Sequence, residues 1–174
     1  MKKWVNVGRS PSLRRVFHCI DTSQHSTKTG TAVFQGTSLL SLDAKGRMTM
    51  PSRHRGAFLS LESVEVTVTR HPDGCVLIYP RSVWESKKRA LSALPYSARL
   101  LQRIVLGSAV DLTIDAAGRL LIPAELRALC HLGKEVALVG LGHHFELWNA
   151  EKLARLEAEA LQAGLSDQAA DFQF

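Results

Sequence analysis

The sequence predicts a mainly β fold with helices, made from two tandem copies of one unit that pack together as a pseudo-dimer. The string SLDAKGRMTMPSRHR at residues 41–55 returns in weakened form at residues 113–127, as TIDAAGRLLIPAELR. Apolar residues alternate on both sides of each DAKGR or DAAGR turn, as in strands with one buried face. Each copy then continues with a short helical segment, a second hairpin and a longer helix, which is the pattern of an internal repeat.

The whole-chain composition is that of an ordinary globular protein. The 174 residues, 45% apolar and 22% charged, allow one domain with a real core or two very small ones. No apolar run approaches the roughly 18 residues of a membrane helix, so no membrane partner is expected. The three cysteines are too few and too widely spaced for a disulfide framework or a CxxC metal pair.

Residues 1–33 differ from the rest, because their apolar residues show no sustained period. They carry six Lys/Arg against one Asp and no secretory signal pattern. We expect a cytoplasmic protein with a disordered N-terminal extension, residues 1–33. The alternative is an N-terminal arm that binds a partner through its positive charge.

The first copy, predicted as residues 36–83, begins with a hairpin. The strands TSLLSLD and RMTMP flank a turn that starts at Asp43 and ends at Gly46. Aspartate accepts backbone N–H bonds in such turns, and glycine supplies the positive φ. The helical segment SRHRGAFLSL follows, and then the strands VEVTVTR and CVLIYP.

A helical connection is predicted over residues 84–107. Ser82 and Glu85 have capping-box spacing before SVWESKKRALSAL, and Ser97 is placed to cap SARLLQRIVLG. The second copy, predicted as residues 108–151, repeats the order with the hairpin AVDLTID–RLLIP, a short helix and the hairpin EVALVGLGHHFELW. Asn149 is placed to cap the C-terminal helix, which with its tail makes up residues 152–174.

A hairpin with one apolar face cannot bury that face alone, whereas two copies in one chain can pack against each other. We therefore expect a pseudo-dimeric β-barrel with flanking helices, on which both turns are polar loops. The D-x-x-G-R turn, followed by an apolar residue and a proline, resembles the swapped-hairpin fold of the AbrB/SpoVT family. Two such units in tandem, the first within FQGTSLLSLDAKGRMTMPSRHR, resemble the MraZ family of bacterial transcriptional regulators over residues 34–161.

The resemblance implies a sequence-specific regulator that binds double-stranded promoter DNA. It further implies repression of the protein's own division and cell-wall gene cluster, nucleoid association, and binding to tandem repeats as a homo-oligomeric ring such as an octamer or dodecamer. Similar proteins usually begin just before FQG, and valine is what the alternative start codon GTG encodes internally. We therefore expect Val33 to mark the native start.

Charge distribution favours the first copy as the main DNA contact. Residues 34–107 carry eleven Lys/Arg against five Asp/Glu, whereas residues 108–174 carry five against ten. Arg47 projects from a tight turn and is expected to read guanine O6 and N7. The other basic residues of the string are expected to contact phosphates, which position without reading sequence; they are Lys45, Arg53 and Arg55.

The second copy keeps less of this charge, since Ala117 and Glu125 stand where the first copy has Lys45 and Arg53. Arg119 is expected to contact DNA with weaker phosphate support, whereas Arg127 is interpreted as a solvated helix-face charge. The loop-orienting residues are Asp43, Gly46, Asp115 and Gly118. Asp43 is expected to hold Arg47 from behind.

Two alternatives have weaker support. AbrB-like hairpins also occur in antitoxin-type interaction proteins, but the tail after Leu161 is short for wrapping a toxin. A metal-dependent enzyme would have to use His71 or His143–His144, which have no third ligand at metal spacing. No catalytic residue, cofactor or metal site is predicted.

Overall fold

The computed structural model describes residues 34–60 and 64–163. The predicted extension 1–33 and the end of the predicted tail therefore lie outside the described residues. No helix in the described part is long and apolar enough to cross a bilayer. In chain order the elements are β1 (Phe34–Ser41), β2 (Arg47–Thr49), α1 (Ser52–Ser60), β3 (Glu65–Arg70), β4 (Val76–Pro80), α2 (Arg81–Ser92), η1 (Tyr96–Ala98), α3 (Arg99–Val105), β5 (Val110–Thr113), β6 (Arg119–Leu121), α4 (Ala124–Leu129), β7 (Glu135–Gly142), β8 (Phe145–Asn149) and α5 (Ala150–Ala163).

The strands form a six-stranded antiparallel sheet in the order β1-β7-β8-β4-β3-β5 and a two-stranded ribbon, β2-β6. This order is symmetric with respect to the two copies, in which β1 to β4 correspond to β5 to β8. When each strand is replaced by its counterpart, the same order is read from the opposite edge of the sheet. The copies pair with each other at β1–β7, β3–β5, β4–β8 and β2–β6. They are thus interlocked and related by a pseudo-twofold axis, as the repeat predicted.

We predicted that the two strands flanking each turn pair with each other, and this prediction is wrong. β1 and β2 flank the first turn but pair with β7 and β6 of the other copy. Among residues 34–60, backbone hydrogen bonds between the strand ends are confined to the turn itself, where the Asp43 N–H donates to the Arg47 carbonyl at 2.9 Å. The reason is that both copies have the same alternating pattern, so strands of the other copy satisfy the ladder equally well.

The pairings do not close the expected barrel. In the described residues the six-stranded sheet ends in two edge strands, β1 and β5, and β2-β6 is a separate ribbon. β2 and β6 have three residues each, too few to link both edges of the larger sheet. The broader prediction of a mainly β fold with helices agrees with the structure.

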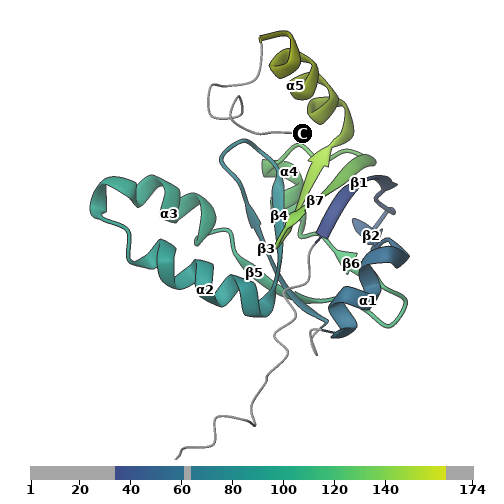
Figure 1. The fold of residues 1–174 in the computed structure, drawn as a ribbon, viewed down its shortest axis with the longest axis horizontal. Helices are drawn as coiled ribbons and strands as arrows, with labels where there is room; N and C mark the ends of the chain where they lie inside the picture. Colours follow the sequence, from purple (N-terminus) through teal and green to yellow (C-terminus); the bar gives the residue numbers. More distant parts are fainter. Residues whose placement is uncertain (1–33, 61–63, 164–174) are drawn as a thin grey trace, which may run out of the picture.

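Two apolar cores lie on opposite faces of the sheet. One lies between the sheet and the β2-β6 ribbon with α1 and α4, and its fully buried residues include Met48 and Leu120 of the ribbon and Met50, which follows β2. The other lies beneath α2, α3 and α5 and includes Trp84 and Trp148. Figure 1 shows α2 and α3 on one side of the sheet and α1 with the ribbon on the other.

The helix ends agree with the sequence analysis only in part. α2 begins at Arg81, before Ser82, and has no side-chain cap; Glu85 instead pairs with Arg81 at 3.0 Å. Ser97 lies inside the 3-10 helix and caps nothing. The Asn149 cap is confirmed, because its Oδ1 accepts the backbone N–H of the third residue of α5 at 3.0 Å. The division into residues 36–83, 84–107, 108–151 and 152–174 stays a prediction.

Candidate nucleic-acid interface

The first turn, Asp43–Arg47, is held by its aspartate. Oδ1 of Asp43 accepts the backbone N–H groups of Lys45 and Arg47, both at 2.9 Å. Gly46 donates its N–H to the Asp43 carbonyl at 2.8 Å and has a φ of +81°, which favours glycine. The backbone geometry therefore accounts for the aspartate and the glycine that the repeat keeps in both copies.

The second turn, Asp115–Arg119, has the same construction. Oδ1 of Asp115 accepts the N–H groups of Ala117 and Arg119 at 2.9 and 2.8 Å, and Gly118 has a φ of +75°. Because β2 and β6 run antiparallel, the two turns lie at opposite ends of the ribbon. The backbone N–H of Met50 donates to the Gly118 carbonyl at 2.8 Å, which attaches the end of the first-copy strand to the second turn.

The side chain of Arg47 is bonded to the Asp43 carboxylate. Its Nε donates to Asp43 Oδ2 at 2.7 Å, and its NH2 atom lies 2.6 Å from the same oxygen. A guanidinium has five N–H donors, and within residues 34–60 and 64–163 the end formed by NH1 and the second N–H of NH2 has no partner. Arg119 is held similarly, with Nε 2.8 Å from Asp115 Oδ2.

The carboxylates are fixed in the charged form. The backbone N–H of Arg47, followed by its side chain, lowers the pKa of Asp43 to about 2. The backbone N–H of Arg119 likewise lowers the pKa of Asp115. At neutral pH both carboxylates are therefore ionised acceptors, and the arginines beside them keep a defined direction.

Arg53 is bound to its own fold. Its NH2 group donates to the Thr37 carbonyl at 3.1 Å and to Ser38 Oγ at 2.6 Å, both on β1. Its Nε donates to Nε2 of His54 at 3.0 Å. The Arg53 residue is nevertheless exposed, so an anion can still approach it.

His54 has a structural role that was not predicted from the sequence. The imidazole is 5% exposed and packs edge-on against Phe34 and Phe145, whose ring centroids lie 6.0 and 4.8 Å away. Burial, and then the charge of Arg53, lower the pKa of His54, which keeps the ring neutral and able to accept the Arg53 hydrogen bond. Nothing in the string RHR distinguishes this histidine from a solvated one.

Arg55 and Arg127, which we call the cross-copy arginines, are half-buried. The Nε of Arg55 donates to the Met50 carbonyl at 2.9 Å, and the Nε of Arg127 donates to the Ile122 carbonyl at 3.1 Å. The interpretation of Arg127 as a solvated helix-face charge is therefore wrong. Lys45, in contrast, is exposed, and its ammonium has no partner among residues 34–60 and 64–163.

The histidines of the metal alternative lie apart from these turns. His71 Nδ1 is 3.4 Å from an Asp73 carboxylate oxygen, and His144 stacks on Tyr79 with ring centroids 4.9 Å apart. Within the described ranges no group of three or more His, Cys, Asp and Glu side chains could hold a metal ion. Cys75 is buried, and burial raises the pKa of its thiol.

Fold and turns together define a tandem-repeat protein whose two interlocked copies each present an arginine-bearing D-x-x-G-R turn. A family model described as "MraZ protein, putative antitoxin-like" matches residues 33–104 and 105–173. The chain belongs to the MraZ family, which the sequence resemblance predicted.

Curated relatives carry the name "Transcriptional regulator MraZ". The Bordetella pertussis protein is 51% identical over 142 residues, which are 82% of this chain and the whole of that relative. The Janthinobacterium protein is 53% identical and the Herminiimonas arsenicoxydans protein 50% identical over the same shares. The chain is thus a member of a family of transcriptional regulators.

Proposed function

We propose that this protein is a sequence-specific DNA-binding regulator that reads duplex promoter DNA with its two D-x-x-G-R turns. One observation carries the proposal: Asp43 holds the Nε side of Arg47 and leaves the outer end of the guanidinium available. Two parallel N–H donors at that end match the O6 and N7 acceptors of guanine in the major groove.

The antiparallel ribbon supports joint use of both turns. Arg47 and Arg119 begin their strands two residue steps apart along the ribbon, which corresponds to about 7 Å. A B-DNA major groove is about 12 Å wide, so one groove segment can accommodate both arginines.

Phosphate contact is proposed mainly for the first copy. Lys45 is an exposed cation without a partner in the described structure, and its counterpart is Ala117. Arg53 is exposed beside β1 and contributes positive charge from a fixed position. Arg55 is held against the Met50 carbonyl and is the weakest candidate of the predicted set for a phosphate.

We further propose, from the resemblance of the sequence to the family, three properties that concern the target, the location and the assembly. The protein represses its own division and cell-wall gene cluster, works in the nucleoid, and assembles as a homo-oligomeric ring of eight or twelve subunits on tandem promoter repeats. Several weak turn–DNA contacts in one assembly raise the overall affinity steeply, since each later contact is intramolecular.

The test is a mobility-shift titration with the duplex upstream of the protein's own gene and a scrambled duplex. Arg47→Ala removes one bidentate contact, which costs about 1–3 kcal/mol per subunit, and preference for the promoter duplex is lost. Arg155→Ala is the matched control, because that exposed α5 arginine pairs with Glu159 far along the chain from either turn. Equal promoter affinity of Arg47→Ala and the native protein would refute the assignment.

An antitoxin-type interaction module is the second candidate, favoured by the wording of the family model. It predicts a stable complex with a second protein in size-exclusion of natively expressed material. The purified chain would then show no preference for the promoter duplex over the scrambled one, and Arg47→Ala would change neither affinity.

A further inference from the structure

The glycine of each turn lies against an arginine of the other copy. A Cβ built on Gly46 would lie 2.5 Å from Nε and 2.6 Å from Cζ of Arg127. A Cβ built on Gly118 would lie 2.7 Å from Nε and 2.8 Å from Cζ of Arg55. Both glycines thus meet two requirements at once, since each has a positive φ and each leaves room for a guanidinium from the other half of the chain.

The same arginines fix the strand end that contacts the turn. The Arg127 Nε donates to the Ile122 carbonyl at 3.1 Å, while the Ile122 N–H donates to the Gly46 carbonyl at 3.0 Å. Arg127 therefore contacts the first turn directly at Gly46 and indirectly through Ile122. The Arg55, Met50 and Gly118 set repeats this arrangement on the other side of the pseudo-twofold axis.

We propose that Arg127 and Arg55 are positioning residues that act across the copies: Arg127 holds the first turn and Arg55 holds the second. The proposed role of the turns in DNA binding gives this arrangement its functional consequence. The second copy, although poor in positive charge, sets the geometry from which Lys45 and Arg47 meet DNA. The two copies therefore cannot act as independent DNA-binding units.

A first experiment needs no DNA. Arg127→Lys keeps the charge but has no planar group to lie over Gly46, and amide hydrogen exchange by NMR reports on both turns of the full chain. The N–H groups of Lys45 and Arg47 are expected to exchange about tenfold faster, as for loss of a charge-assisted hydrogen bond. Those of the second turn keep their native rates.

Arg55→Lys is the matched control, and it is expected to accelerate exchange at Ala117 and Arg119 while leaving the first turn unchanged. The proposal would be overturned if a substitution accelerated amide exchange in the turn of its own copy, in both turns equally, or in neither turn. If a lysine variant does not fold, amide exchange is measured instead on Arg127→Met and Arg55→Met, which keep the apolar length of the side chain.

A thermal double-mutant cycle gives an independent result. Gly46→Ala lowers Tm through its positive φ and through collision with Arg127, so its effect is expected to be smaller in an Arg127→Lys background. In an Arg55→Lys background the effect of Gly46→Ala is expected to be unchanged. Equal effects in both backgrounds would overturn the cross-copy assignment.

DNA binding separates this proposal from the proposed function. Arg127→Met, which removes the charge, is expected to weaken promoter affinity about tenfold with an unchanged salt slope, because no phosphate contact is lost. A lower salt slope for Arg127→Met would mean direct phosphate contact and would overturn the positioning role. Suppose that each arginine substitution accelerates hydrogen exchange in the turn of the other copy, but Arg47→Ala leaves promoter affinity unchanged. This result would uphold the cross-copy contacts and refute the proposed function.

Discussion

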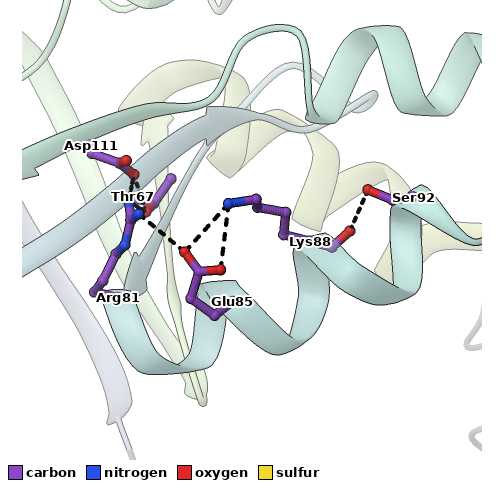
Figure 2. Close-up of polar contacts among 6 residues, drawn as sticks. All are labelled: Thr67, Arg81, Glu85, Lys88, Ser92 and Asp111. Carbon is purple, nitrogen blue, oxygen red and sulfur yellow. Dashed lines mark hydrogen bonds and ion pairs between the residues drawn. The ribbon is translucent and has the colours of Figure 1, made fainter.

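Asp111 is predicted to stabilise the fold by satisfying a buried hydroxyl at the junction of the two copies. It lies on the edge strand β5, opposite Thr67 of β3. Thr67 is fully buried, and its Oγ1 donates to Asp111 Oδ1 at 2.7 Å. Arg81 of α2 forms an ion pair with Asp111 and another with Glu85, so one network joins α2, β3 and β5 (Figure 2).

The cost of Asp111→Ala follows from burial. Without Asp111 the buried Thr67 O–H loses its acceptor, although the hydroxyl oxygen still accepts a hydrogen bond from Arg81 NH1 at 3.5 Å. A buried polar group that loses a partner costs about 1–3 kcal/mol. The Arg81 ion pair adds at most about 1 kcal/mol, because the two side chains are 31% and 58% exposed and water screens them. Taking about 2 kcal/mol in total, and about 2–4 °C per kcal/mol for a chain of this size, Tm falls by about 4–8 °C.

The assay is thermal unfolding of four variants monitored by circular dichroism. Thr67→Val removes the hydroxyl that needs Asp111, so in that background Asp111→Ala is expected to cost only the exposed ion pair, at most about 4 °C. Glu85→Ala, which removes the other partner of Arg81, is the exposed control with a similarly small effect. An equal fall in Tm for Asp111→Ala in both backgrounds would refute the reasoning.

Three further predictions concern the turns and α5. Lys45→Ala lowers the salt slope of promoter binding by about one unit, whereas Ala117→Lys raises it; identical slopes would show that neither position meets a phosphate. In an NMR titration the Asp43 carboxyl is expected to have a pKa of about 2, below its ordinary value of 3.8. The stability that it contributes is therefore present above about pH 4 and is lost as pH falls through 2. A titration midpoint near pH 4 would contradict the turn geometry. Asn149→Ala removes the N-cap of α5 at a cost of about 1 kcal/mol, and Tm falls by about 2–4 °C. Asn149→Asp keeps the capping acceptor but loses the hydrogen bond that the Asn149 side-chain amide donates to the His131 carbonyl, so its Tm is expected to lie between that of Asn149→Ala and the native value.

Local chemistry made much of the architecture readable from the sequence. The repeat, the D-x-x-G-R turns and the buried faces of Met48 and Met50 all follow from patterns that span a few residues. Aspartate and glycine act on their own backbone, so the turn needs no distant partner to be recognised. The pairing of Asp43 with Arg47 was predictable for the same reason, since four residues separate the two.

Strand partners and arginine roles were decided only by the tertiary structure. Both copies carry the same alternating pattern, so the pattern cannot say whether β2 pairs with β1 or with β6; packing of the two apolar ribbon faces into one core selects the exchange. From the sequence, Arg55 was expected to contact a phosphate and Arg127 to be a solvated charge on a helix face. Arg55 contacts Gly118 and Arg127 contacts Gly46 because the pseudo-twofold axis brings each turn beside a helix of the other copy. A contact between residues some 60 or 80 positions apart leaves no local signal in the sequence.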